Sequence, residues 1–222
     1  MRSKIGTDGQ EPSFIEAARR SQIIDCAIEA LAEVGFQNTS LAEIAKRARI
    51  SKSVILYYFD GKAQLLREVM TTVYTRGHEF MFPRIQASAS YAEALRNYIH
   101  AEVEFVAANW NSVRAAMEIA ANNTVPGEGP AFEQAESEWL FSSLEALFKG
   151  GQESGEFRQF STRVMAMTLR SALDGIPRQV LLNPQFDLAA CRSELVTTFD
   201  IATRRSEGPA GMPATATTGD VI

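Results

Sequence analysis

The stretch TSLAEIAKRARISKSVILYYFDGK, residues 39–62, decides the fold. Its spacing predicts two short amphipathic helices with a turn of only three residues, 49–51, between them. Ser40 and Glu43 form a capping box that starts the first helix, and Ser51 can cap the second. Two short helices joined in this way, the second carrying a hydroxyl, a lysine and adjacent tyrosines, are typical of a helix-turn-helix DNA-binding unit.

The apolar residues of this stretch predict how its two helices pack. One face of the first helix and the inner side of the second are expected in a small core, namely Leu41, Ile44, Ala45, Ala48, Val54, Ile55 and Phe59. Ser53, Leu56, Tyr57 and Tyr58 then remain to face outward, wholly or in part. The second helix is therefore expected to present a mixed polar and aromatic surface.

A longer pattern extends across three expected helices. It consists, in order, of Gly35, Phe36, Thr39, Ile44, Ala45, Ser51, Tyr57, Phe59, Lys62 and Leu65. This pattern, over about residues 20–66, resembles the amino-terminal DNA-binding domain of the TetR family of transcriptional regulators. The family often places a tyrosine where Leu56 stands, so no base preference is carried over to that position.

The resemblance and the surface pattern together give the residues expected at DNA. Ser40, Lys52, Tyr57 and Lys62 are expected on phosphates, and Ser53, Leu56 and Tyr58 nearest the base edges. The full expected set is Thr39, Ser40, Lys46, Ser51, Lys52, Ser53, Leu56, Tyr57, Tyr58 and Lys62. The alternative is that the two tyrosines only close the small core and the lysines are solvated.

The charge of the chain is unevenly distributed. The net charge is −5, which disfavours a DNA partner because phosphate affinity comes from Lys and Arg. Residues 39–62 nevertheless hold five cations against two anions, whereas residues 83–205 hold 11 cations against 15 anions. This asymmetry indicates a small basic DNA-binding unit on an acidic body.

The rest of the chain predicts an all-α protein of about nine helices. We expect a disordered tail at 1–12, a helix-turn-helix domain at 13–66, a helical ligand-binding and dimerisation domain at 67–205, and a second disordered tail at 206–222. Ser90 and Asp187 are expected to cap helices of the body. The helix after Gly61 is expected to end at Pro83 and to join the two domains.

A small-molecule site in the body is implied by the resemblance. Polar groups on an otherwise apolar helical face would orient a ligand. The expected ligand-binding residues are Glu102, Phe105, Trp110, Met117, Trp139, Phe141, Arg170 and Asp174. The alternative for the aromatic residues and the methionine is that they are plain core. The segment ALDGIPRQVLLNP, residues 172–184, further resembles the carboxyl-terminal domain of betaine-type repressors within the family.

The remaining expectations concern partners and chemistry. The resemblance implies a homodimer through the last two long helices, a double-stranded operator with an inverted repeat, and a small-molecule effector. No catalytic set, phosphate loop or metal-binding motif is recognisable, so we expect no enzyme, no cofactor and no metal. The opening residues contain no signal-peptide pattern and no apolar run long enough for a membrane span occurs, so we expect a cytoplasmic protein. Alternatives to a ligand-released repressor are an activator, a ligand-independent DNA binder and a helical protein-binding module.

Overall fold

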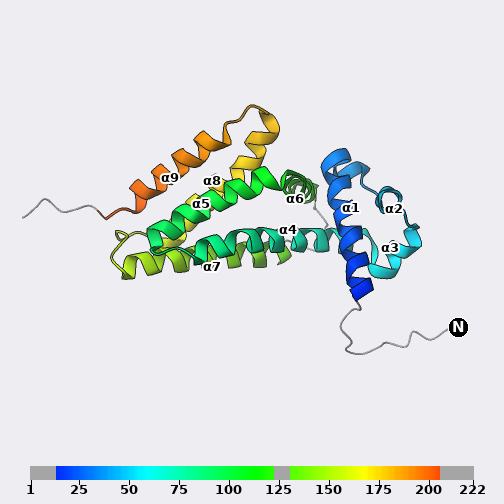
Figure 1. Ribbon diagram of the computed structural model, residues 1–222, viewed down its shortest axis with the longest axis horizontal. Coiled ribbons are helices and arrows are strands. Elements are labelled where there is room, and N and C mark those ends of the chain that lie inside the picture. The colour runs from blue at the N-terminus through cyan, green and yellow to red at the C-terminus, as the bar shows by residue number, and fades with distance from the viewer. Residues whose placement is uncertain (1–13, 123–130, 206–222) are drawn as a thin grey trace, which may run out of the picture.

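The computed structural model describes residues 14–122 and 131–205, with the side chains of 131–137, 139 and 140 excepted. Over the described residues the chain forms nine helices, and this confirms the predicted all-α fold. The two expected tails lie outside the described residues. Figure 1 shows α1, α2 and α3 gathered at one end of the molecule, with α4 extending from them into the body.

The first three helices are α1 (Phe14–Asn38), α2 (Leu41–Ala48) and α3 (Lys52–Tyr58). Their bounds follow local signals. Gly35 interrupts α1 with φ 75° and ψ 170°, a backbone conformation that favours glycine. The predicted cap of α2 is present, because the Ser40 hydroxyl accepts a hydrogen bond from the Glu43 amide at 3.1 Å.

The fourth helix, α4 (Gly61–Gln86), is longer than the sequence pattern indicated. The prediction that it ends at Pro83 is wrong. Proline removes only its own N–H, and its carbonyl still accepts a hydrogen bond from Ala87 at 3.2 Å, so the helix continues for another turn. The predicted boundary between residues 66 and 67 falls inside this uninterrupted helix.

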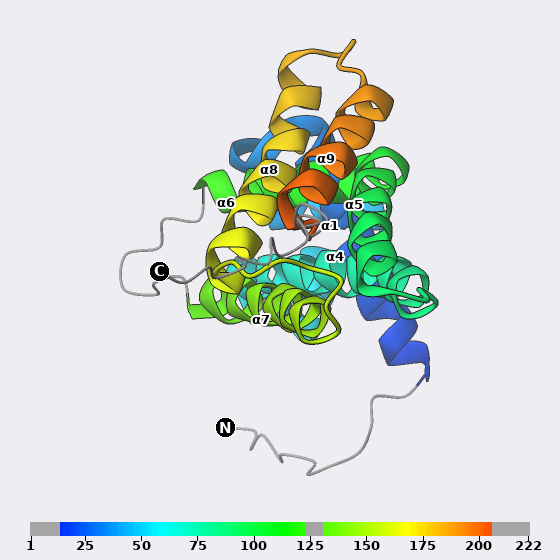
Figure 2. The same ribbon diagram turned by 90° about the vertical axis from the view of Figure 1, so that its left-hand side faces the viewer.

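The body is completed by five helices: α5 (Tyr91–Ala108), α6 (Trp110–Asn122), α7 (Ala131–Glu153), α8 (Thr162–Leu182) and α9 (Leu188–Thr203). The expected caps of α5 and α9 are present: Ser90 accepts from the Glu93 amide at 3.1 Å, and Asp187 accepts from the Ala190 amide at 2.9 Å. In Figure 2 the ends of α8 and α9 project beyond the other helices of the body. None of the described helices is both long enough and apolar enough to cross a membrane.

Two separate clusters of buried side chains hold the fold together. The first cluster joins α1, α2, α3 and the first half of α4, and it also takes in Ala115 and Ile119 of α6. The second cluster joins the end of α4 to α5, α6, α7, α8 and α9. Helices α4 and α6 therefore contribute to both clusters, and each provides a packed connection between the α1–α3 unit and the body.

Candidate DNA-binding surface and effector site

The turn between α2 and α3 is closed by main-chain hydrogen bonds. Arg49 adopts φ 54° and ψ 42°, a left-handed conformation that reverses the chain after α2. The Ile50 amide donates to the Ala45 carbonyl at 3.0 Å and satisfies the end of the helix. Because the turn is short, α3 begins at Lys52 with its orientation fixed relative to α2.

Helix α3 buries one side and exposes the other. Ile55 and Phe59 are fully buried in the first cluster, as the sequence predicted. On the opposite side, Leu56 is 49% exposed and Tyr57 is 75% exposed. Such exposure of large apolar side chains on a short helix favours a binding surface, because a helix of this kind stabilises the fold through its other side.

Three exposed cations lie on α2, in the turn and at the start of α3. Lys46, Arg49 and Lys52 are all exposed. Arg47 is different, because its guanidinium pairs with Glu33 at 2.7 Å and with Glu43 at 2.9 Å. The positive charge available to phosphates is therefore concentrated at the turn and at the start of α3.

Three residues of the expected DNA set are more enclosed than the sequence indicated. Thr39 is fully buried, and its hydroxyl donates to the Gly35 carbonyl at 2.8 Å, so this side chain supports the surface from within. Tyr58 is half-buried, with its ring edge-on to that of Tyr57 at 5.0 Å. Ser40 and Ser51 are exposed at the two helix starts. Ser51 stands at the N-cap position of α3, but the expected capping hydrogen bond is not formed, because its hydroxyl shares a 2.7 Å hydrogen bond with that of Ser53.

Lys62 is the third enclosed residue. Its ammonium group donates to the Phe36 carbonyl at 3.3 Å and lies 4.5 Å from the centre of the Phe36 ring. Burial lowers the pKa of Lys62 from its ordinary value. Lys62 therefore fastens the start of α4 to the end of α1, and a phosphate contact from it would be an additional role.

Arg20 on α1 positions the end of α3, and sequence reasoning missed it. Its guanidinium donates to the Tyr58 carbonyl at 2.5 Å, forms an ion pair with Glu68 and lies 4.6 Å from the centre of the Phe59 ring. One arginine thus connects α1, α3 and α4. Glu68 is 48 residues away from it in sequence, so no local pattern could have indicated the pair.

In the body, the structure brings three of the expected ligand-binding residues together: a buried arginine and two acidic residues. Arg170 is only 8% exposed. Its guanidinium donates to Glu102 at 2.9 Å and to Asp174 at 2.6 Å. It also donates to the Tyr98 hydroxyl at 2.8 Å, a contact that the sequence reasoning missed although Tyr98 lies one turn before Glu102 on α5.

The protonation states of this cluster follow from its burial and its charges. Burial by itself would lower the pKa of Arg170, but Glu102, Tyr98 and Asp174 raise it well above the ordinary value. Burial raises the pKa of Tyr98 to about 12. At neutral pH the cluster therefore contains a charged guanidinium and a neutral phenol, and it ties α5 to α8.

The other expected ligand-binding residues lie in or beside the second cluster. Phe105 is buried, with its ring 5.7 Å from that of Phe80 on α4. Trp110 and Met117 of α6 are partly buried against the same cluster. The Arg163 guanidinium lies over the Phe141 ring, 4.7 Å from its centre. Trp139 belongs to α7, and its side chain lies outside the described ones.

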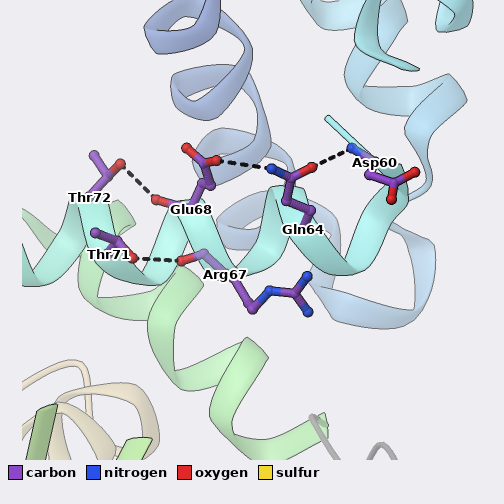
Figure 3. A pocket seen from close by; sticks show the side chains of 6 residues that line it. All are labelled: Asp60, Gln64, Arg67, Glu68, Thr71 and Thr72. Atoms are coloured by element: carbon purple, nitrogen blue, oxygen red, sulfur yellow. Dashed lines mark hydrogen bonds between the residues drawn. The ribbon is translucent and has the colours of Figure 1, made fainter. Parts of the chain in front are cut away.

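A surface hollow of about 570 Å³ lies along the first half of α4. Figure 3 shows the six residues that line it: Asp60, Gln64, Arg67, Glu68, Thr71 and Thr72. Several of their polar groups are already used within the helix, since Thr71 donates to the Arg67 carbonyl at 3.1 Å and Thr72 to the Glu68 carbonyl at 2.7 Å. None of these six residues belongs to the expected ligand-binding set.

Comparison of the sequence with known proteins matches its amino-terminal part to a family. Residues 23–69 match the family model described as bacterial regulatory proteins, tetR family. The HTH-type transcriptional regulator BetI from Cronobacter sakazakii is 27% identical over 188 residues, which cover 83% of this chain and 90% of the relative.

Solved structures agree in fold. A transcriptional regulator from Saccharomonospora viridis in complex with choline has a TM-score of 0.76 at 17% identity, covering 85% of this chain and 99% of that one. AibR, in complex with isovaleryl coenzyme A and operator DNA, has a TM-score of 0.68 at 22% identity. The match covers 81% of this chain and 97% of AibR. The relatives are named as regulators, in agreement with the expectation that the chain is not an enzyme. Residues 23–69 thus carry the helix-turn-helix DNA-binding domain of the TetR family, and the chain as a whole is similar to transcriptional regulators of that family.

Proposed function

We propose that the protein is a sequence-specific repressor that binds an inverted-repeat operator as a homodimer and is released from it by a small molecule. The observation that carries the proposal is the exposed side of α3, where Lys52, Leu56 and Tyr57 face solvent while Ile55 and Phe59 anchor the helix. In a dimer, two such helices would enter successive major grooves about 34 Å apart.

The dimer is supported by the outer faces of α8 and α9. Val164 is 60% exposed, Met167 49% and Leu182 68% on α8, and Ile201 is 64% exposed on α9. A Cβ added at Gly175, in the middle of α8, would meet nothing within 4 Å, so this face has room for the close approach of another helix. Exposed apolar side chains along two helices are stabilised when a second copy covers them.

The effector would act through helices that touch both parts of the molecule. Helix α4 places Leu65, Val69 and Val73 in the first buried cluster and Met81 in the second. A ligand that binds the body better in one arrangement of α4 than in another shifts the spacing of the two α3 helices. Crosslinking the two α1–α3 units of a dimer to each other should therefore abolish release by the effector, and an unchanged release would contradict this role of α4.

The identity of the effector does not follow from the fold. The similar structures were solved with choline, a cation, and with isovaleryl coenzyme A, which carries phosphates. One architecture therefore serves ligands of opposite charge, and the effector of this chain has to be inferred from its own side chains.

The experiment that tests the proposed function is a selection of bound fragments from genomic DNA, followed by footprinting of the selected sites. A shared inverted repeat, protected in two halves one helical turn apart, is the expected result. The variant Tyr57→Ala should lose the selected fragments, whereas Lys149→Ala, at an exposed position on α7 of the body, should retain them. A chain that selects no common sequence, or a Tyr57→Ala variant that selects the same one equally well, would contradict the proposal.

A further inference from the structure

Arg114 on α6 carries a buried donor without a partner. Its Nε is buried and makes no hydrogen bond, and it is the one side-chain nitrogen or oxygen atom found in that condition over the described part of the chain. Leaving a charged N–H group buried and unpaired is unfavourable, because the group has lost its water without gaining an acceptor.

The arginines that lie in comparable surroundings have acidic partners. Arg47 pairs with Glu33 and Glu43, and Arg170 pairs with Glu102 and Asp174. The residue placed to pair with Arg114 on its own helix is Glu118, four positions later. Glu118 is engaged elsewhere, since its Oε2 accepts the hydrogen bond of the Phe36 amide at 2.9 Å. One carboxylate oxygen of Glu118 is thus used at the end of α1, and no hydrogen bond joins Glu118 to the Nε atom of Arg114.

The position of Arg114 on α6 indicates what surrounds it. Trp110 lies four residues before it and Met117 three residues after it, and both pack against the second buried cluster. Residues at these spacings share one side of a helix. The opposite side of α6 is occupied by Ala115 and Ile119 in the first cluster. Arg114 therefore lies between the side of α6 that packs on the second cluster and Glu118, which contacts the end of α1.

We propose that Arg114 binds the carboxylate or phosphate group of an anionic effector whose apolar part packs beside Trp110 and Met117. This inference rests on the proposed ligand response and specifies the chemistry of the ligand. The planar guanidinium matches both acids, because it offers parallel N–H donors to two oxygens. Arg170, the buried arginine of the body, already donates to Tyr98, Glu102 and Asp174 and lies among a surplus of negative charge, so it is not a second anion site.

The test uses three probes with the same alkyl chain: octanoate, octyl phosphate and octanol. Calorimetric titration and thermal unfolding are measured on the full chain without DNA, at constant ionic strength, for the wild type and for Arg114→Met, Arg114→Lys and Arg19→Met. Arg19 is the matched control, because it is an arginine of α1 that donates to Gln22 on its own helix. Working without DNA separates the outcome from that of the proposed function, which is measured by DNA binding.

We expect saturable binding of octanoate or octyl phosphate that is tighter than that of octanol. Arg114→Met should weaken the anion by roughly 10- to 100-fold, which corresponds to the loss of a charged hydrogen bond, and should leave octanol unchanged. The affinity of Arg114→Lys for the anion should fall between those of the wild type and Arg114→Met. The affinity of Arg19→Met should equal that of the wild type. Equal affinity of the wild type and Arg114→Met for both anions, or no preference for either anion over octanol, would overturn the proposal.

Thermal unfolding of the free protein supplies a second criterion. If Arg114 serves a ligand, then Arg114→Met removes an unpaired charge from the protein and should leave the melting temperature equal or higher. If Arg114 serves only the fold, the same variant should melt at a lower temperature. A lower melting temperature without any change in anion affinity would likewise overturn the proposal.

Discussion

The Oε2 atom of Glu118 lies 2.9 Å from the backbone nitrogen of Phe36 and links α6 of the body to the end of α1. The carbonyl of the same Phe36 accepts the Lys62 ammonium at 3.3 Å and the Thr39 amide at 3.3 Å. Phe36 therefore connects three elements: the helix bordering the proposed effector site, the start of α4 and the residue before the cap of α2. Phe36 thus provides a polar connection between the body and the proposed DNA-binding surface.

Replacing Glu118 tests this link. Glu118→Ala leaves the partly buried Phe36 amide without its acceptor, so it should lower the free energy of unfolding by about 1–3 kcal/mol in urea titrations. It should also reduce the effect of the effector on operator affinity, because α6 loses its hydrogen bond to Phe36 of α1. Glu118→Gln is the control, since its amide oxygen can still accept the hydrogen bond. A Glu118→Ala variant with normal stability and a normal effector response would show that the contact carries no coupling.

The residues around α3 should separate into phosphate and base contacts. Lys52→Ala should weaken binding to operator and random DNA alike and reduce the slope of log K against log salt concentration by about one. Leu56→Ala should keep that slope and change the preferred operator bases. Anisotropy titrations at several salt concentrations measure both. A Lys52→Ala variant with an unchanged slope would remove Lys52 from the phosphate contacts.

The outer face of α8 should form the dimer contact. Met167 is 49% exposed in the single chain, and Met167→Lys would place a charge in the proposed interface. We expect the dimer dissociation constant to rise by roughly tenfold or more in analytical ultracentrifugation. Phe14→Lys, at an 88% exposed position on α1, is the control and should leave the dimer intact. Equal dissociation constants for Met167→Lys and the wild type would place the interface elsewhere.

The hydrogen bonds of the Glu156 carboxylate should make the stability of the protein depend on pH. Its carboxylate accepts hydrogen bonds from the backbone amides of Tyr91 at 3.2 Å and Ala92 at 3.0 Å, in the first turn of α5. Burial raises its pKa, but these hydrogen bonds outweigh burial and leave the pKa below its ordinary value. A lowered folded pKa means that the stabilisation is present above the unfolded value, about 4.3, and is lost as the pH falls through the folded value.

Glu156→Gln should therefore be less stable than the wild type by a constant amount near pH 7. The difference should shrink below about pH 4, where the wild-type carboxyl also becomes protonated. Glu153→Gln is the control, because Glu153 is exposed and pairs only within its own helix with Lys149. Urea titrations between pH 7 and pH 3 measure the difference. A difference that stays constant over this range would assign the effect to packing and not to charge.

Whether the sequence predicted a feature of the fold correctly depends on how far apart in sequence the interacting residues lie. The starts of α2, α5 and α9 are where Ser40, Ser90 and Asp187 predicted them, because a cap contacts an amide only three residues away. The end of α4 was predicted wrongly, because the local signal of Pro83 was outweighed by the continued helix around it. Local signals therefore located helix starts better than helix ends.

The sequence predicted only part of the DNA-binding and ligand-binding sites, because many of their contacts join residues far apart in sequence. Glu102, Arg170 and Asp174 were recognisable as polar residues on apolar helical faces. Tyr98 was missed, since a buried tyrosine is ordinary core until its hydroxyl is seen 2.8 Å from Arg170, 72 residues away. Thr39 matched the family pattern, but only the fold reveals that its hydroxyl is turned inward to Gly35. Contacts across many residues of sequence are thus the part that required the structure.

The exposed side of α3 is proposed to read a specific operator, and a comparison of two DNA duplexes tests this. Fluorescence anisotropy of the purified protein is measured on a labelled duplex from its own selected sites and on a scrambled duplex, from low to physiological salt. We expect affinity for the operator to exceed that for the scrambled duplex by at least a thousandfold at physiological salt, and affinity for both to fall steeply as salt rises. Equal affinities for the two duplexes, at every salt concentration, would contradict the account.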